Sequence, residues 1–249
     1  MNERPTIAAF RPADDRAEDA RTVIEAAGGR PLLDPMLSVE PTGASPRTDA
    51  AITIFTSATV ATLPAVQSWE PNATTVVAVG PKTAAALEDL GLAVDRVPTE
   101  FTSAGIVEEL GDEVDGLKIE VARSNHGSDV LLDGLMTNGA YLHETILYRL
   151  VRPDDAGHSI EALLAGEVAA LAFSSSLTVE HFLACVDEHA NRDALEEALE
   201  EVLVGVIGPP TAATAKSAGI PVNIVASSAT FETLVDELMT ELETPTRRA

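Results

Sequence analysis

The sequence predicts an α/β protein with two similar domains, each built on a parallel sheet. Apolar runs of four to six residues, rich in Val and Ile, alternate with helical patterns, as is typical of parallel sheets covered by helices. With 249 residues the chain exceeds one typical domain and has room for two. One series of elements also occurs twice, which is the strongest indication of two domains.

The repeat consists of a strand, a second strand that leads through a glycine into a helix, and a further helix. VGPKTAAALEDLG at 79–91 returns as IGPPTAATAKSAG at 207–219, with the same spacing between the two glycines. The register continues without a gap into the last helix, so that Ile106 corresponds to Leu234. The elements of the first copy are expected at 51–63, 74–98 and 101–110, and those of the second at 170–182, 202–226 and 229–238.

A weaker similarity lies upstream of each copy. Residues 7–35 and 117–145 both read as an apolar strand ending in Arg, a polar loop, a helix, a glycine and another extended run. Each domain is therefore expected to contain several strand–helix units. A further helix is predicted at 192–202, where Leu195 and Leu199 lie on one face and the carboxylates form a solvated face.

The repeated glycines indicate how each strand joins its helix. Gly80 and Gly208 are expected to allow a sharp turn, and the prolines after them suit a first helical turn. Thr83 and Thr211 then place hydroxyl groups beside unpaired backbone N–H groups at the carboxyl edge of a sheet, where α/β folds bind anions. Two matching copies favour a shared ligand over two ordinary turns. The glycines expected to end these helices in the left-handed conformation are Gly91 and Gly219.

Hydroxyl side chains also follow two other predicted strands. Thr56 and Ser57 come directly after ITIF, and a run of serines at 174–176 comes directly after LAF. Their ordinary role is to cap a helix, and ligand binding is the alternative. The chain contains no G-x-S-x-G elbow, no Walker loop and no G-x-G-x-x-G after a strand, so nucleotide cofactors are poorly supported.

The chain is strongly acidic, with 40 Asp and Glu residues against 16 Lys and Arg and a formal net charge of -24. Such a surface repels nucleic acid and anionic membranes, which bind chiefly clustered Lys and Arg. Because the charge is spread along the whole chain, it favours adaptation to a salty cytoplasm, where salt screens self-repulsion. An acidic patch for a basic partner is the alternative.

The remaining compositional signals indicate a soluble cytoplasmic protein. Cys185 is the single cysteine, and no Cys/His cluster has the spacing of a zinc site. No apolar run approaches the roughly 18 residues that span a bilayer, and the first residues lack the pattern of a secretory signal.

An ordered set of short motifs resembles the uroporphyrinogen-III synthase family of tetrapyrrole biosynthesis. The motifs are FTSATV, VGPKTAAALEDLG, ILYR, FSSSLTVEHF and IGPPTAATAKSAG, and the resemblance extends over nearly the whole chain. It implies a monomeric lyase that cyclises hydroxymethylbilane to uroporphyrinogen III, with loss of water and inversion of the last pyrrole ring through a spiro intermediate. It also implies that no cofactor or metal takes part and that the preceding enzyme of the pathway supplies the substrate.

The resemblance implies discontinuous domains, whereas a tandem repeat alone would suggest contiguous ones. One domain would comprise residues 1–35 and 153–249, and the other residues 42–143. Segments 36–41 and 144–152 would form a two-stranded ribbon linker, in keeping with their extended, Pro-bounded character. The substrate would then lie in a cleft between the domains.

The resemblance and the strand ends together select the candidate site residues. Tyr148 matches the tyrosine of the family's linker pattern and is expected to orient or protonate the departing hydroxyl, although packing of the linker explains its position equally well. Thr83 and Thr211 are the leading substrate binders. Arg11 and Arg123 end equivalent strands and would clamp substrate carboxylates. The further hydroxyl candidates are Ser57, Ser103, Ser175 and Ser176.

A second class of protein stays open from the residues alone. A two-domain, hinge-type binding protein for an anionic small molecule, without catalysis, would need the same donor-lined edges. The histidines give no help, because none has a catalytic spacing, and they are expected at surface or packing positions: His126, His143, His158, His181 and His189.

Overall fold

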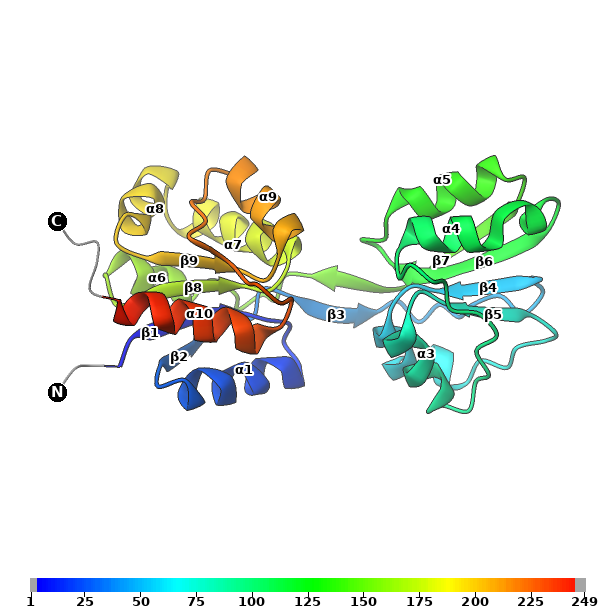
Figure 1. Cartoon of the computed structure of the whole chain (residues 1–249), viewed down its shortest axis with the longest axis horizontal. Helices are drawn as coiled ribbons and strands as arrows, with labels where there is room; N and C mark the ends of the chain where they lie inside the picture. The colour runs from blue at the N-terminus through cyan, green and yellow to red at the C-terminus, as the bar shows by residue number, and fades with distance from the viewer. Residues whose placement is uncertain (1–3, 245–249) are drawn as a thin grey trace. The chain divides into compact units, whose positions relative to one another are not determined.

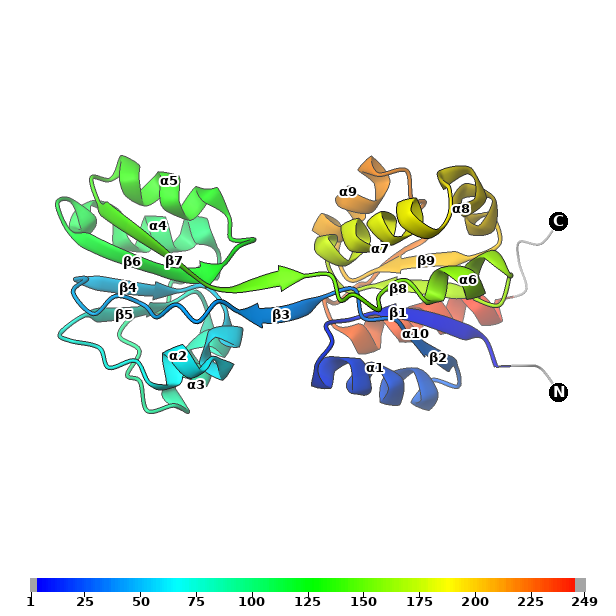
Figure 2. The ribbon, with the colours of Figure 1, turned by 180° about the vertical axis from the view of Figure 1, so that it is seen from behind.

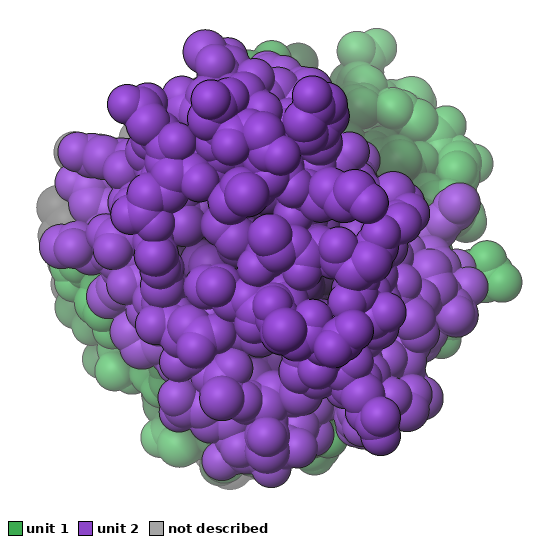
Figure 3. Space-filling view, turned by 90° about the vertical axis from the view of Figure 1, so that its right-hand side faces the viewer, with its two compact units in different colours: residues 1–38, 151–249 green, residues 39–150 purple. Residues whose placement is uncertain are grey.

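The computed structural model describes residues 4–244 and divides into two compact units, coloured separately in Figure 3. Unit 1 takes in the chain up to Ser38 and again from Val151 onward, and unit 2 runs from Val39 to Leu150. Each unit is an α/β layer structure of its own (Figure 1).

Unit 1 is built on a five-stranded sheet with the order β10–β9–β8–β1–β2, and all its pairs are parallel. The register aligns Phe10, the last residue of β1, with Phe173, the last residue of β8. The strands are β1 (Thr6–Phe10), β2 (Arg30–Leu33), β8 (Ala170–Phe173), β9 (Leu203–Val206) and β10 (Ile224–Val225).

Helices cover both faces of this sheet (Figures 1 and 2). One face packs against α1 and α10, where Ile24 and Leu234 are fully buried. The other packs against α6 to α9, and the rings of Phe10 and Phe173 stack there with 4.6 Å between centroids. The helices are α1 (Asp15–Ala26), α6 (Ser159–Leu164), α7 (Ser176–His189), α8 (Arg192–Leu199), α9 (Pro209–Ser217) and α10 (Phe231–Glu243).

Unit 2 has a five-stranded sheet with the order β3–β7–β6–β4–β5. The pairs β7–β6, β6–β4 and β4–β5 are parallel, and β3 lies next to β7 (Figure 2). The strands are β3 (Ser38–Pro41), β4 (Ile52–Phe55), β5 (Thr75–Ala78), β6 (Lys118–Ser124) and β7 (Tyr141–Val151).

The sheet of unit 2 is also covered on both faces. Helices α4 and α5 pack on one face through Ile106 and Leu131, and η1, α2 and α3 pack on the other through Val60 and Leu87. The helices are α2 (Pro64–Gln67), α3 (Pro81–Glu88), α4 (Ser103–Leu110) and α5 (Asp129–Thr137), with 3₁₀ helices η1 (Ala58–Thr62) and η2 (Gly111–Val114). None of the helices in residues 4–244 is long and apolar enough to cross a membrane.

The two strand orders agree with the internal repeat in the sequence. The series β9–β8–β1–β2 in unit 1 corresponds to β5–β4–β6–β7 in unit 2. The chain enters this common arrangement at different strands, since the first of the four corresponding strands along the chain is β1 in unit 1 and β4 in unit 2. The α/β architecture with parallel sheets is therefore confirmed, and the two sheets are related by a permutation of chain order.

The glycines before α3 and α9 differ in backbone conformation from the glycines after these helices. Gly91 and Gly219 both have φ of 82°, and they end α3 and α9 in the left-handed conformation as predicted. Gly80 and Gly208, with φ of -170° and 179°, are in extended backbone that any residue adopts, so the expected need for a special turn was wrong. At Gly80 the reason is space, because a Cβ there would lie 3.2 Å from the Cβ of Phe101.

Candidate functional site

The carboxyl edge of the sheet in unit 2 contains a pocket of about 210 Å³. It lies where the adjacent strands β4 and β6 end. From β4 the chain continues to its neighbour β5 on one side of the sheet, and from β6 it continues to β7 on the opposite side. Such a point, where the strand order reverses, is where open α/β sheets bind ligands. The pocket brings together four of the predicted site residues, Ser57, Ser103, Arg123 and Tyr148.

Two of these residues lie at helix N-termini. Ser57 follows β4 and caps η1 by accepting a hydrogen bond from Thr59 N at 3.1 Å. Ser103 is the first residue of α4, whose cap is Thr102, which accepts from Gly105 N at 3.0 Å. The pocket is therefore bordered by helix ends that favour negative charge.

Arg123 is buried and already has partners within unit 2. Its Nε donates to Glu144 Oε1 at 2.5 Å, and its Nη1 donates to the main-chain carbonyl of Ser128 at 2.6 Å. A Cβ on Gly127 would overlap with this side chain. Arg123 thus fixes the loop between β6 and α5, which forms one wall of the pocket.

Tyr148 is 3% exposed and packs with Phe55 and Ala122. A register shift in the β6–β7 pairing aligns it with Ser124, at the end of β6. Its hydroxyl has no hydrogen bond to residues 4–244, yet it is not among the fully buried polar atoms that lack a partner, Trp69 Nε1 and Glu120 Oε1. The ring is therefore part of the core and the hydroxyl keeps contact with solvent in the pocket.

Thr83 and Thr211 are both 4% exposed and occupy the third position of α3 and of α9. Neither lines the pocket of unit 2. Their hydroxyls have no hydrogen-bond partner in the described part of the chain and, like that of Tyr148, are not among the fully buried polar atoms that lack one. They therefore stay in contact with solvent. Helix α9 begins with two prolines, which have no N–H group, so Thr211 carries the first backbone N–H of this helix. In α3 the backbone N–H of Thr83 donates to Gly80 O at 3.0 Å.

The corresponding edge of unit 1 carries the remaining candidates. Ser175 forms a capping box with Thr178, and Ser176 accepts a hydrogen bond from Thr214 Oγ1 at 2.9 Å, which joins α7 to α9. Both serines therefore have structural partners at the helix N-terminus that follows β8.

Arg11 follows β1 in unit 1 as Arg123 ends β6 in unit 2. Its guanidinium carbon lies 4.7 Å above the ring of Phe231, and its Nε donates to Arg16 O at 3.4 Å. Burial is the main cause that lowers the pKa of Arg11 below its ordinary value, followed by the charge of Arg16. Within residues 4–244 Arg11 has no ion pair, in contrast to Arg123.

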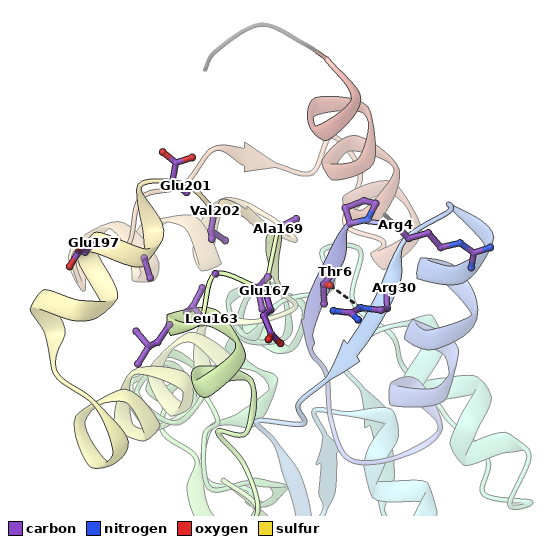
Figure 4. Close-up of a pocket in the computed structure, with 14 residues that line it drawn as sticks. Arg4, Thr6, Arg30, Leu163, Glu167, Ala169, Glu197, Glu201 and Val202 are labelled. Atoms are coloured by element: carbon purple, nitrogen blue, oxygen red, sulfur yellow. Dashed lines mark hydrogen bonds between the residues drawn. The ribbon is translucent and has the colours of Figure 1, made fainter. Parts of the chain in front are cut away.

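A larger cavity of about 1150 Å³ lies at the opposite, amino edge of the sheet in unit 1 (Figure 4). Arg4 and Arg30 lie on one side of it and Glu197 and Glu201 on the other, with Glu167 between them. It contains none of the predicted site residues. The carboxyl edges, where strands lead into helix N-termini, remain the better candidates despite their smaller pocket.

Comparisons with known proteins identify the family. The family model of uroporphyrinogen-III synthase matches residues 18–236. The chain belongs to the uroporphyrinogen-III synthase family. A provisionally named uroporphyrinogen-III synthase of Methanothermobacter thermautotrophicus is 33% identical over 232 residues, covering 86% of this chain and 90% of that protein. The uroporphyrinogen-III synthase of Synechococcus elongatus is 27% identical over 174 residues, covering 68% of this chain and 64% of that protein.

Solved structures of the same family share the fold. A mutant uroporphyrinogen III synthase of Thermus thermophilus aligns with a TM-score of 0.66 at 21% identity, covering 96% of this chain and 99% of that one. The enzyme of Helicobacter pylori aligns with a TM-score of 0.60 at 17% identity, covering 96% and 100%. At these identities the likeness extends to the fold alone.

His126 is a pocket residue of this uroporphyrinogen-III synthase family member that sequence reasoning missed. Because it has no catalytic spacing, it is expected at a surface or packing position, and it is exposed. Its backbone N–H donates to Ser124 Oγ at 3.3 Å, in the loop that follows β6. The available signal was its position directly after a strand end, the same signal that selected Ser57.

Proposed function

We propose that the protein cyclises hydroxymethylbilane to uroporphyrinogen III, with loss of water and inversion of the last pyrrole ring through a spiro intermediate. The observation that carries this proposal is the family match over residues 18–236. A hinge-type binding protein without catalysis is not favoured, because the family and its named relatives are synthases.

The substrate places a particular demand on this chain. Hydroxymethylbilane carries acetate and propionate groups on its pyrroles, so a polyanion must approach a protein of net charge -24. Backbone N–H groups at helix N-termini attract carboxylates without adding positive charge, and each contributes about 0.3–1 kcal/mol at exposed positions. Salt weakens the overall repulsion, which is why we propose that the acidic surface is an adaptation to a salty cytoplasm.

We assign the binding roles to the carboxyl edges of the two sheets. The hydroxyls of Thr83 and Thr211, which keep contact with solvent, are proposed to bind substrate carboxylates or pyrrole N–H groups. The other proposed binders are Ser57, Ser103, Ser175, Ser176, Arg11 and Arg123. Tyr148 is proposed to orient or protonate the departing hydroxyl, which is supported by its phenol in the unit 2 pocket.

The main catalytic contribution is proposed to be orientation. An enzyme that folds the linear tetrapyrrole so that the inverted ring closes first needs only to outrun spontaneous cyclisation without inversion. No cofactor or metal is proposed. We also propose a monomeric cytoplasmic enzyme that receives its substrate from the preceding enzyme and binds neither nucleic acid nor membranes.

Product analysis tests the proposal directly. Hydroxymethylbilane is generated enzymatically and incubated with the protein in high salt, and the products are oxidised and separated into isomers I and III. Buffer of the same salt concentration without the protein gives the spontaneous background. Isomer III is expected in the presence of the protein, and isomer I alone would refute the proposed function.

A further inference from the structure

Phe101 is an exposed aromatic residue beside the pocket of unit 2. It is 59% exposed and lies in the loop that precedes α4. Two observations place it close to the pocket. Its Cβ and Cγ pack against Gly80, the residue after Val79, which lines the pocket. Phe101 also lies two positions before Ser103, which lines the pocket as well. The phenyl ring therefore lies next to residues that line a polar cavity at the ligand-binding edge of the sheet, although Phe101 does not line that cavity itself.

The loop that carries Phe101 is fixed by close backbone contacts. Any side chain at Gly105 would overlap with the carbonyl oxygen of Glu100, so the loop packs directly against the first turn of α4. Thr102 N donates to Glu100 O at 2.8 Å, and the Thr102 side chain caps α4. The absence of a side chain at Gly80 leaves room for the ring itself. The backbone that carries the ring is thus held in position before any ligand binds, which reduces the entropy cost of binding.

We propose that Phe101 stacks against a pyrrole ring of the substrate and so positions it over the pocket. This inference rests on the proposed function, since it takes a pyrrole as the ligand. The flat apolar face of Phe suits a five-membered aromatic ring, and offset stacking adds to the area that both rings remove from water. In a strongly acidic chain it also supplies attraction to the tetrapyrrole that neither salt nor carboxylate repulsion weakens.

Variants of Phe101 test the role of the flat ring. Phe101→Ala is expected to lower kcat/KM for hydroxymethylbilane about tenfold, mainly through a higher KM, and Phe101→Tyr is expected to retain wild-type values. Phe101→Leu keeps apolar bulk without a flat face and is expected to resemble the alanine variant. Full activity of either Phe101→Ala or Phe101→Leu would overturn the stacking role.

Tyr141→Ala is the matched control. Tyr141 is 70% exposed and begins β7, so it lies at the opposite edge of the same sheet. Its replacement is expected to leave kcat/KM within about twofold of wild type, because Tyr141 is exposed and lies at the edge of the sheet opposite the pocket. An exposed side chain without structural partners also contributes little to stability. A loss equal to that of Phe101→Ala would overturn the inference, since it would show a general effect of removing surface aromatics.

The outcomes also separate this inference from the proposed function. Wild-type protein that gives only isomer I would refute the function. Wild-type protein that gives isomer III, with Phe101→Ala unchanged in KM and in kcat, would leave the function standing and overturn the stacking role. Thermal unfolding of each variant is measured alongside and is expected to match wild type, because the ring is mostly exposed.

Discussion

Arg123 and Glu144 form an ion pair between the neighbouring strands β6 and β7, with 2.5 Å between Nε and Oε1. The arginine side chain is 6% exposed and the glutamate 34%. The Arg123 guanidinium is therefore paired with a carboxylate within unit 2, and it also donates a hydrogen bond to the carbonyl of Ser128. Arg11, at the equivalent strand end of unit 1, stacks on Phe231 and has no ion pair among residues 4–244.

Arg123→Met should destabilise the protein. The substitution removes the donors of Glu144 and Ser128 O from a buried position, and we expect the free energy of unfolding to fall by about 2–3 kcal/mol. Chemical denaturation measures this change. Arg21→Met removes an exposed pair with Glu18 and should cost no more than about 0.5 kcal/mol. Equal effects of the two substitutions would show that burial of the Arg123 pair contributes nothing.

Arg11→Gln should weaken substrate binding with little loss of stability. The variant loses a cation that has no carboxylate within ion-pair distance among the described residues, and KM for hydroxymethylbilane should rise about tenfold at low salt and less at high salt. Steady-state kinetics at two salt concentrations measure the effect. Arg30→Gln, at the amino edge of the same sheet, is the control, and an equal rise in its KM would contradict a specific role for Arg11.

Gly219→Ala and Gly208→Ala should differ although both glycines belong to one motif. Gly219 has φ of 82°, and alanine there should cost about 1 kcal/mol. Gly208 is in extended backbone, and the nearest heavy atom to an added Cβ is 4.0 Å away, so alanine should cost almost nothing. Denaturant midpoints of the two variants measure the difference, and the reverse order would be inconsistent with these backbone conformations.

Tyr148→Phe should reduce kcat without reducing stability. Its hydroxyl has no hydrogen bond to residues 4–244 and keeps contact with solvent, so removing it leaves no buried partner unsatisfied. If the phenol orients or protonates the departing hydroxyl, kcat should fall by about 100-fold, at the lower end of the range for acid catalysis. Single-turnover assays with thermal unfolding of the same samples check both parts. Unchanged kcat would leave Tyr148 with its packing role alone.

Cys185 should react slowly with thiol reagents in the folded protein. It is fully buried, 3.4 Å from Arg152 Nη1 and 3.9 Å from Met36 Sδ, and burial raises the pKa of its thiol, a shift that Arg152 only partly opposes. A raised pKa means a smaller thiolate fraction at pH 8 in the folded state, and stability that is lost as the pH rises above the ordinary thiol pKa. Labelling with a chromogenic disulfide should therefore be much faster in denaturant, and equal rates would contradict this environment.

The repeat and the alternation of strands and helices carried enough information to predict the fold. Gly91 and Gly219 were also predictable, because a left-handed helix end has few alternatives to glycine. Gly80 was misinterpreted, since its need for space arises from Phe101, which lies in a different loop. A contact of that kind depends on packing that the spacing of residues does not contain.

The pocket was predictable in part for a similar reason. Position after a strand end was sufficient to select Ser57, and the motif resemblance was sufficient for Tyr148. The partner of Arg123 was not, because Glu144 comes from the next strand and its distance depends on the register between β6 and β7. Thr83 lies outside the pocket of unit 2. The sequence could not show this, because the packing of a short helix decides which of its sides faces a cavity.

The permuted chain order affects the biosynthesis of the protein. Strands β1 and β2 leave the ribosome before unit 2, but β8, the neighbour of β1 in the sheet, is translated only after the whole of unit 2. Unit 2 has all its strands once Leu150 has emerged, so it can fold while the first segment still lacks its partners. Strands β1 and β2 can pair with each other at that stage, but β1 must wait for its other neighbour, β8, until synthesis has passed unit 2.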